Sequence, residues 1–220
     1  MTKKELAQYL DATNLSNTAS VEDIENLCTQ AIKYGFKSVC VHPHYVELAK
    51  ELLINTPVLV CTVIGFPLGM NTLYTKVYET QNAIDDGADE IDMVINVAEL
   101  KNKNLDYCLE EINSVKLACG GKTLKVIVET SQLTLDEKVF AAKLIGSSNA
   151  DYIKTSTGFV GTGAQLEDIE LWKPILKPLN KSIKASGGIR DLASCLKFIN
   201  IGVDRIGTSK AVEIIEDYQE

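Results

Sequence analysis

Short apolar segments alternate with longer amphipathic segments along the whole chain. The apolar segments predict strands at 9–12, 38–41, 58–64, 90–95, 124–128, 152–154, 182–185 and 205–206. Where these segments are long they are almost continuously apolar, which is typical of parallel strands covered by helices. Eight strand–helix units over 220 residues predict one (β/α)8 barrel spanning residues 1–220. An open doubly wound sheet is the alternative, but no GxGxxG follows the first strand and the units continue evenly to the C-terminus.

The segments between the predicted strands have the spacing of amphipathic helices. Two of them, at 72–86 and 106–119, place apolar or small side chains on one helical face: Leu73, Val77, Thr80 and Ile84 in the first, and Cys108, Ile112, Val115 and Cys119 in the second. Residues that favour helix ends agree with this assignment. They are the N-cap pairs Ser20 with Asp23 and Thr134 with Glu137, and the C-terminal glycines Gly35 and Gly87.

One short pattern recurs at three predicted junctions between a helix and the next strand. Segments 87–92, 149–154 and 202–207 each have Gly or Asn, then a small residue, then Asp, then the start of a strand. The pattern therefore marks the αβ connections of one barrel and not a solenoid repeat.

Composition excludes several classes of function. The net charge of -8 disfavours a nucleic-acid partner, which requires a basic face, but it allows a phosphorylated small substrate in a locally positive site. No segment approaches the roughly 20 apolar residues that cross a bilayer, and residues 1–10 lack the apolar part of a signal peptide. The six cysteines form no CxxC pair, which is typical of reduced thiols in a protein core. We therefore expect a cytoplasmic protein without a membrane or nucleic-acid partner.

Polar residues gather where the predicted strands end, which is where active sites form in (β/α)8 barrels. These positions are Asp11, Thr13, Cys40, His42, Gly65, Asp92, Asn96, Glu129, Thr130, Lys154, Lys184, Gly207, Thr208 and Ser209. His42 and His44 are the only histidines, and Pro43 between them breaks any regular ligand spacing. We therefore predict that the site needs neither a metal ion nor a cofactor.

Lys154 ends the short strand in Tyr-Ile-Lys-Thr-Ser-Thr-Gly, and Lys184 lies in the next predicted strand, before a Gly-Gly turn. Burial lowers the pKa of a lysine, and a second lysine within about 4–6 Å lowers it further, which produces a nucleophilic amine. This setting predicts a Schiff base on Lys154 with Lys184 beside it. The alternatives are that Lys154 extends to solvent or pairs with a carboxylate, and that Lys184 forms a surface ion pair. The hydroxyl groups after Lys154 favour the catalytic interpretation, because a solvated lysine would not need them.

Three other strand-end residues receive supporting roles. Asp92 is predicted to pair with a lysine or to transfer protons in the same pocket. Asp11 is either a pocket residue or a plain turn residue, with Thr13 capping the segment that follows. Cys40 is expected to line the pocket without acting as a nucleophile, because no base is placed to activate its thiol.

Glycine-rich turns predict a phosphate site. Gly187 and Gly188 follow the seventh strand, and Gly207, Thr208 and Ser209 open the last helix, the two places where barrels commonly bind phosphate. Segment 158–163 could close over the anion, and Thr155 and Gly158 offer a hydroxyl group and close approach of the main chain. Each glycine pair taken alone is equally an ordinary turn or helix cap.

Seven motifs together resemble one known family. They are Asp11-Ala-Thr13, Ser38-Val-Cys40-Val, Val63-Ile-Gly-Phe-Pro67, Glu90-Ile-Asp92-Met-Val-Ile-Asn96, Tyr152-Ile-Lys154-Thr-Ser-Thr-Gly158, Ile183-Lys184-Ala-Ser-Gly-Gly188 and Arg205-Ile-Gly-Thr-Ser209. In this order, from about Leu10 to Gly207, the chain resembles the deoxyribose-phosphate aldolases. These are class I aldolases of (β/α)8 fold that use no metal.

The resemblance implies a reaction and a set of roles. The reaction is reversible cleavage of 2-deoxy-D-ribose 5-phosphate to D-glyceraldehyde 3-phosphate and acetaldehyde, in the catabolism of deoxynucleosides. Lys154 would form the Schiff base, Lys184 would perturb it and Asp92 would transfer protons. The glycines and Ser209 would hold the phosphate, and the protein would be a homodimer.

The chain departs from the family pattern at a few positions. Thr162 and Gln165 stand where more glycine and a threonine are expected, and Ala98 stands where glycine is expected. These changes could alter loop closure or substrate preference but remove no catalytic group. Some members carry a tail tyrosine that approaches the site, and Tyr218 is the candidate here. Two other hypotheses stay open: a related Schiff-base aldolase or transaldolase acting on another sugar phosphate, and a catalytically silent barrel that binds one.

Overall fold

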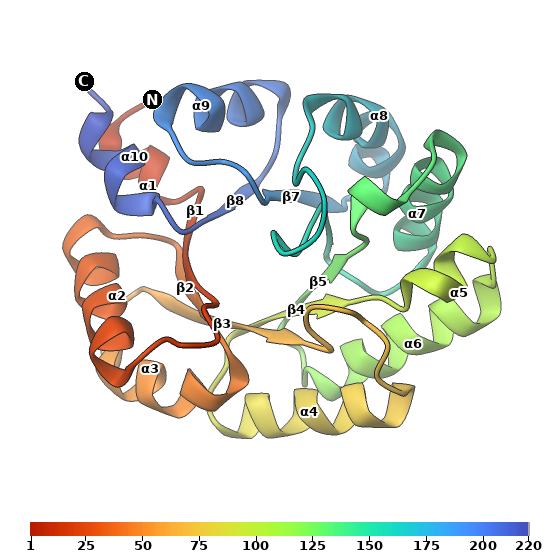
Figure 1. The fold of residues 1–220 in the computed structure, drawn as a ribbon, viewed down its shortest axis with the longest axis horizontal. Helices are drawn as coiled ribbons and strands as arrows, with labels where there is room; N and C mark the ends of the chain where they lie inside the picture. Colours follow the sequence, from red (N-terminus) through yellow and green to blue (C-terminus); the bar gives the residue numbers. More distant parts are fainter. Residues whose placement is uncertain (220) are drawn as a thin grey trace.

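The computed structural model describes residues 1–219, within which eight parallel strands close into a barrel surrounded by helices (Figure 1). The strands neighbour one another in chain order, and β1 pairs with β8 to complete the ring. They are β1 (Leu10–Asn14), β2 (Ser38–Val41), β3 (Leu59–Ile64), β4 (Glu90–Val94), β5 (Thr123–Ile127), β6 (Tyr152–Lys154), β7 (Ser182–Ser186) and β8 (Arg205–Thr208). The prediction of a (β/α)8 barrel is confirmed, and the open doubly wound sheet is wrong.

Helices cover the outer face of the barrel. The α-helices are α1 (Lys3–Ala7), α2 (Val21–Tyr34), α3 (Val46–Leu52), α4 (Leu73–Asp85), α5 (Val97–Lys101), α6 (Leu105–Ala118), α7 (Leu135–Ser147), α8 (Leu166–Leu176), α9 (Leu192–Ile201) and α10 (Ala211–Asp217). Short 3-10 helices occur at η1 (Pro43–Tyr45), η2 (Thr130–Gln132) and η3 (Lys177–Leu179). Across residues 1–219, no helix combines the length and apolar character needed to cross a membrane.

Strand boundaries agree closely with the apolar pattern. The predictions 38–41 and 152–154 match β2 and β6, and the largest differences are at β1 and β8, which extend through Asn14 and Thr208. Polar residues are not recognised as strand by an apolar pattern, yet Asn14 pairs with Val41 and Thr208 with Ala12. Main-chain hydrogen bonds to a neighbouring strand therefore determine these ends more than side-chain polarity does.

The predicted helix-end signals are present. Ser20 and Thr134 each form a capping box, with Asp23 and Glu137 respectively, at the start of α2 and α7. Gly35 ends α2 in the left-handed conformation, which glycine adopts without steric cost. These signals place the helices along the chain independently of tertiary contacts.

The aspartate of the recurring junction pattern joins neighbouring strands. Its carboxylate accepts a hydrogen bond from a main-chain N–H near the start of the preceding strand. The three pairs are Asp89 with Val60 (3.1 Å), Asp151 with Leu124 (2.7 Å) and Asp204 with Ile183 (2.8 Å). The main-chain N–H of each aspartate also donates to the main-chain carbonyl of its partner in the preceding strand. The repeat therefore connects β3 to β4, β5 to β6 and β7 to β8 at the N-terminal end of the barrel.

The buried face of α4 differs from its prediction, whereas α6 buries Cys108, Ile112 and Val115 as expected. The fully buried residues of α4 are Lys76, Thr80 and Ala83, and Val77 and Ile84 are only half-buried. Lys76 Nζ lies 2.7 Å from Glu111 Oε1 of α6, with both side chains inaccessible to solvent. An ion pair thus replaces part of the apolar contact between these helices, and a pattern of apolar positions cannot reveal it.

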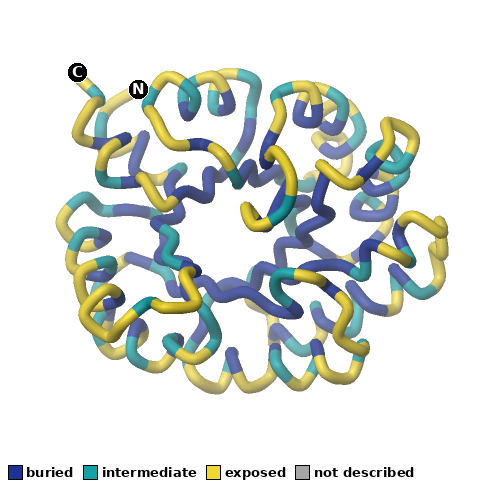
Figure 2. The backbone as a smooth tube through the Cα atoms, in the orientation of Figure 1, coloured by how far each residue is buried: buried dark blue, intermediate teal, exposed yellow. Residues whose placement is uncertain are grey.

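The apolar core is a shell between the barrel and its helices. Figure 2 shows buried strands and buried inner helix faces, with exposed residues on the outer turns. The barrel interior has its own, much smaller apolar cluster of Leu15, Cys40, Cys61, Val63 and Phe66. The rest of the interior is polar, and it leads directly to the candidate site.

Candidate active site

Charged side chains fill much of the barrel interior, where most (β/α)8 barrels pack branched apolar residues. The strand register arranges these positions in three layers, counted from the N-terminal end. The first contains Ser38, Glu90, Tyr152 and Arg205; the second contains Asp11, Cys61, Lys125 and Lys184; and the third contains Cys40, Asp92, Lys154 and Gly207. Every strand therefore contributes to this interior, which is polar except around Cys40 and Cys61.

Arg205 organises the first layer. Its guanidinium Nε donates to Asp11 Oδ1 at 2.7 Å, and its Nη1 and Nη2 donate to the two oxygens of Glu90 at 2.9 Å each. Nη2 also donates to Ser38 Oγ at 3.0 Å. Arg205, Glu90 and Asp11 are all buried, so these charge-assisted bonds are shielded from solvent.

Lys125 connects this layer to Asp92. Lys125 Nζ donates to Glu90 Oε2 at 2.6 Å and to Asp92 Oδ1 at 3.0 Å. The Cys61 thiol donates to the same Asp92 oxygen at 3.2 Å. Asp92 Oδ1 is therefore held by Lys125 and Cys61, which leaves Oδ2 for groups nearer the C-terminal end of the barrel.

Lys154 and Lys184 share that second oxygen. Each Nζ lies 2.7 Å from Asp92 Oδ2, and Lys184 Nζ also lies 2.5 Å from Asp11 Oδ2. A Cβ at position 207 would lie 3.1 Å from Lys184 Cε, so Gly207 leaves the space that this lysine side chain occupies. Asp92 and Lys184 lie in mid-strand and not at strand ends as the sequence analysis assumed.

The electrostatics of these groups correct one expectation. Burial opposes the charge on Lys184, but the carboxylates of Asp11 and Asp92 outweigh it and raise the pKa of this lysine. A neighbouring lysine, Lys125, does lower this pKa, but the net shift is upward, so Lys184 does not have the low pKa expected of two adjacent lysines. Burial also opposes the charge on Asp92, yet Lys125, Lys154 and Lys184 hold the pKa of this carboxyl well below its usual range.

The remaining interior groups are also held in their charged forms. Burial is outweighed by Arg205 and Lys184 at Asp11 and by Lys125 and Arg205 at Glu90, so the pKa of each carboxyl is lowered. Burial is likewise outweighed at Lys125 and Arg205, whose pKa values are raised by nearby carboxylates. Three carboxylates and three cations among the described residues thus neutralise one another. Lys154 is the fourth lysine or arginine of this interior. Its carboxylate partner is Asp92, which it shares with Lys184.

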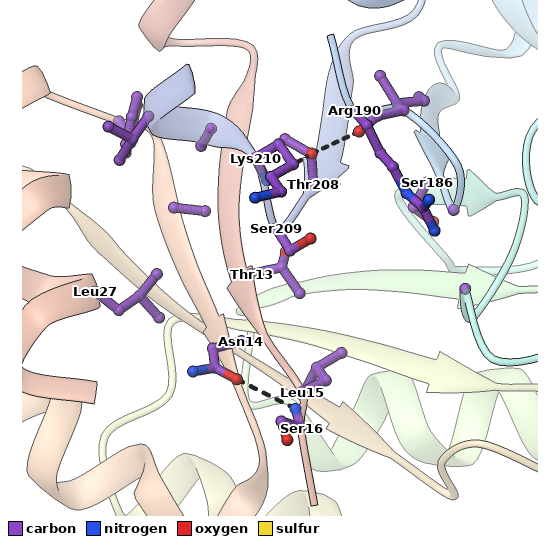
Figure 3. A pocket seen from close by; sticks show the side chains of 18 of the residues that line it. Thr13, Asn14, Leu15, Ser16, Leu27, Ser186, Arg190, Thr208, Ser209 and Lys210 are labelled. Carbon is purple, nitrogen blue, oxygen red and sulfur yellow. Dashed lines mark hydrogen bonds between the residues drawn. The ribbon is translucent and has the colours of Figure 1, made fainter. Parts of the chain in front are cut away.

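Lys154 lines a cavity of about 600 Å³ at the C-terminal end of the barrel. Figure 3 shows Thr13, Ser186, Arg190, Thr208, Ser209 and Lys210 around it. Lys154 is the one member of the buried charge network, within residues 1–219, that also lines the cavity. Its amine is therefore in contact with both the network and the space that a substrate could enter.

The predicted binding residues divide into two groups. Those that line the cavity are Thr13, Gly158, Gly187, Gly188, Gly207, Thr208 and Ser209. Asp11, Cys40 and Thr155 are buried away from its wall. Asp11 belongs to the ion-pair network, and the Thr155 hydroxyl donates to the carbonyl of Ser186 at 3.0 Å. A hydrogen bond with Cys61 lowers the pKa of the Cys40 thiol, against the effect of burial.

Two cations of the cavity were missed by the sequence analysis. Arg190 and Lys210 are exposed at its rim, near Thr208 and Ser209 (Figure 3). Each follows one of the two predicted phosphate turns, at Gly187-Gly188 and at Gly207-Thr208-Ser209. A cation directly after a glycine-rich anion turn was the available signal. Both can meet a phosphate that approaches from solvent.

The connection from β6 to α8, residues 155–165, packs on the turn after β7. Ala164 N donates to the carbonyl of Gly187 at 3.1 Å, and a Cβ at Gly163 would lie 2.4 Å from the same carbonyl oxygen. Glu129 Oε2 accepts hydrogen bonds from the N–H and the hydroxyl of Thr157, at 3.1 and 2.5 Å. Figure 1 shows this connection projecting toward the centre of the ring. It is therefore tied down at both ends, close to the cavity.

The positions that depart from the family pattern lie in different places. Thr162 and Gln165 are in the β6–α8 connection, with the carbonyl of Thr162 next to Gly188. Ala98 is exposed on α5 and does not line the cavity. The Tyr218 hydroxyl donates to the carbonyl of Met1, which directs this side chain away from the cavity.

One group of possible metal ligands lies within the described residues. The ligand atoms of Cys40, Cys61 and Asp92 are all within 4.8 Å of one another. Asp92 already pairs with three lysines, including Lys154, and their charges oppose a cation at this point. The donor set therefore does not fit a metal centre. His42 contacts the carbonyl of Leu15 and lies outside this group.

Comparison with known proteins agrees with this geometry. A model of the DeoC/LacD family of aldolases matches residues 6–208. Proteins named deoxyribose-phosphate aldolase from Malacoplasma penetrans and Ureaplasma parvum are 54% identical over 213 residues and 57% identical over 210 residues. These alignments cover 97% and 96% of this chain and 96% and 97% of the relatives.

A solved structure gives the same assignment at lower identity. The tetrameric deoxyribose phosphate aldolase from Aeropyrum pernix is 34% identical and superimposes with a TM-score of 0.91, covering 98% of this chain and 91% of that one. The chain belongs to the DeoC/LacD family of aldolases, which are carbon–carbon lyases.

Proposed function

We propose that this aldolase acts through a Schiff base on Lys154. The reaction is the reversible cleavage of 2-deoxy-D-ribose 5-phosphate to D-glyceraldehyde 3-phosphate and acetaldehyde. The position of Lys154 is the main support for this role. Its amine contacts Asp92, and the residue also lines the cavity.

The bond changes follow from imine chemistry. The Lys154 amine adds to the C1 aldehyde of the open-chain sugar, and loss of water leaves a protonated imine. This imine accepts the electron pair of the C2–C3 bond while the C3 hydroxyl loses its proton, which releases D-glyceraldehyde 3-phosphate and leaves an enamine. A proton then returns to C2, and water hydrolyses the new imine to acetaldehyde and the free amine.

Asp92 and Lys184 are the proposed proton-transfer groups. Asp92 Oδ2 lies 2.7 Å from both lysine Nζ atoms, so it can hand a proton between Lys154, Lys184 and a bound water. Lys184 keeps a proton available because Asp11 and Asp92 stabilise its charged form. The two groups can therefore serve proton removal at C3 and proton return at C2.

Arg190, Lys210 and Ser209 are the proposed phosphate ligands. All three line the cavity at the turns after β7 and β8, where the glycines allow close approach of the main chain. Because this cluster and Lys154 line the same cavity, the substrate would bind with C1 at the lysine and its phosphate at the rim. The buried charges below Lys154 are not available to the phosphate.

Borohydride trapping tests the role of Lys154. The purified chain is incubated with 2-deoxyribose 5-phosphate and borohydride, and peptides are analysed by mass spectrometry. We expect a reduced adduct on Lys154, and loss of both adduct and turnover in Lys154→Ala. Lys177→Ala, which removes a solvent-exposed lysine, should behave as the parent. Turnover by Lys154→Ala, or an adduct on a different lysine, would end the proposal.

We also propose a homodimer and a cytoplasmic location. Tyr74 and Tyr78 are one turn apart on α4 and are 83% and 66% exposed, which supports a contact surface there. The relative from Aeropyrum pernix is tetrameric, so assembly occurs among relatives. All six cysteines of the sequence are buried free thiols, which supports a reducing compartment. Sedimentation of the parent and of Tyr74→Glu measures the assembly.

A further inference from the structure

We propose that Glu90 and Arg205, which do not reach the cavity, are positioning residues that set the pH range in which Lys154 reacts, with opposite signs. This inference rests on the proposed Schiff-base role of Lys154. The two residues lie in the layer of the barrel farthest from the cavity, on β4 and β8. They act through Asp11, Lys125 and Asp92 and do not contact substrate.

A continuous chain of short contacts joins the two residues to Lys154. One branch runs from Arg205 to Asp11, from Asp11 to Lys184 (2.5 Å) and from Lys184 to Asp92 (2.7 Å). The other runs from Glu90 to Lys125 (2.6 Å) and from Lys125 to Asp92 (3.0 Å). Both branches meet at Asp92, which contacts Lys154 at 2.7 Å.

The charges of this interior act on one another without solvent screening. Asp11, Asp92, Lys125 and Lys184 are fully buried, and Glu90 and Arg205 are 3% exposed. In such an environment a unit charge at a distance of about 10 Å displaces an ionisation by on the order of one pH unit. The displacement depends on the sign of the charge and not on the shape of the side chain.

Each element around Lys154 contributes to its surroundings. The charged and titratable groups are Asp11 on β1, Cys40 on β2, Cys61 on β3, Glu90 and Asp92 on β4, Lys125 on β5, Glu129 after β5, Tyr152 on β6, Lys184 on β7, Arg205 on β8, and Asp23, Arg190 and Lys210 at the cavity. Among the charged residues of the network, Glu90 and Arg205 are the two that make no direct contact with Asp92, Lys154 or Lys184.

The direction of each effect follows from the charge count. Arg205→Gln removes a positive charge from the network, which favours the charged form of Lys154, and the reaction requires a higher pH. Glu90→Gln removes a negative charge, so Lys154 loses its proton at a lower pH. The partners keep other contacts, because Asp11 retains Lys184 and Lys125 retains Asp92. Arg205→Lys keeps the positive charge. The double variant Glu90→Gln/Arg205→Gln removes one charge of each sign, so the net charge of the interior is the same as in the parent.

Reductive ethylation measures the reactive form of Lys154 without the full reaction. Acetaldehyde and the amine lose water to form an iminium, and cyanoborohydride delivers hydride to its carbon, which leaves an ethyl group on the lysine. The rate at Lys154 is measured by peptide mass spectrometry from pH 5 to pH 9 and divided by the rate at exposed Lys177 in the same sample. This ratio removes the pH dependence of the reagent itself.

The expected midpoint of the Lys154 profile moves up by about one pH unit in Arg205→Gln and down by about one in Glu90→Gln. It should return close to the parent value in Arg205→Lys and in the double variant. Shifts in the same direction, or no shift in either single variant, would overturn the inference. If Arg205→Gln does not fold, as judged by circular dichroism, a downward shift in Glu90→Gln is still required. No preferential ethylation of Lys154 in the parent at any pH would instead overturn its proposed role.

Discussion

Lys154 and Lys184 show how neighbours determine what a residue can do. They are the same type of residue on adjacent strands and share one oxygen of Asp92. Lys184 has a second carboxylate, Asp11, which raises its pKa, whereas Lys154 lies at the cavity wall. The difference between a proton-holding lysine and a proposed nucleophile therefore comes from one additional ion pair and from access to the cavity.

Arg190 and Lys210 lead to a prediction about substrate binding. Arg190→Ala and Lys210→Ala should each raise KM for the phosphorylated substrate roughly tenfold, because each removes a charge-assisted contact to the phosphate. We expect little change in kcat, because neither residue contacts Lys154. Steady-state kinetics with 2-deoxyribose 5-phosphate and with unphosphorylated 2-deoxyribose provide the test. An equal loss for both sugars would show that the two cations do not recognise the phosphate.

The elements around the cavity depend on close main-chain contacts. The β6–α8 connection and the turn after β7 approach so closely at Gly163 and Gly187 that no side chain fits between them. The anchor at the other end of the connection is Glu129, which holds Thr157. Phe159, within the same connection, packs edge-to-face on Phe66 with ring centroids 5.1 Å apart. These contacts fix the position of the connection relative to the cavity.

Gly163→Ala should lower kcat/KM roughly tenfold, because its Cβ would meet the carbonyl of Gly187 at 2.4 Å and displace the connection. Gly120→Ala is the matched control. Both glycines have positive φ, but nothing lies within 4 Å of a Cβ at Gly120. Each variant should lose roughly 1 kcal/mol of stability from strain at a positive φ. Gly163→Ala should lose more because of its clash with Gly187, and only this variant should lose activity. Equal kinetics for the two variants would show that this contact does not position the site.

The ion pair between α4 and α6 leads to a prediction about stability. Lys76→Met leaves Glu111 buried without its partner, so the free energy of unfolding should fall by roughly 3–5 kcal/mol. The double variant Lys76→Met/Glu111→Leu should recover much of this loss. Urea unfolding of the two single variants and the double variant measures the coupling. Additive losses would mean that the two charges do not stabilise each other.

Across the whole molecule, closure of the barrel concentrates charge in its interior. Hydrogen bonds from Arg205 to Asp11 connect residues 194 positions apart in the sequence. The helices and the apolar shell exclude water from this network, and α1 and α10 pack beside each other near the joined β1 and β8 (Figure 1). Stability and the proposed chemistry therefore depend on the same buried groups.

The pH dependence of stability should reflect these groups. Neighbouring cations lower the pKa of Asp11, Glu90 and Asp92, so their stabilising contribution is present above about pH 4 and is lost as the pH falls through and below the usual carboxyl range. Lys125 and Lys184 have raised pKa values, so their contribution is lost only as the pH rises beyond about 10. We expect a thermal midpoint that is nearly constant from about pH 5 to pH 9 and falls steeply in acid. A constant midpoint down to pH 3 would contradict this account.

The order of strands and helices and most of the cavity-lining candidates could be predicted from the amino-acid sequence alone. Apolar periodicity, capping residues and glycine turns act over a few neighbouring positions, so they are legible in a single chain. The candidates Thr13, Lys154, Gly187 and Ser209 lie near strand ends, and barrel geometry brings such ends together. For the same reason Arg190 and Lys210, which follow two of these turns, were available to sequence reasoning although it missed them.

The pairing of the buried charges, in contrast, is visible only in the folded barrel. Asp11 was a possible turn residue in the sequence and is an interior partner of Lys184 and Arg205. Glu90, Lys125 and Arg205 lie in predicted strands but received no role, because an apolar pattern does not show which charges a strand buries. Their pairing depends on the stagger of eight strands around the closed barrel within residues 1–219, which sets the height of each side chain. No local pattern contains that stagger, and so the charge network appears only when the barrel closes.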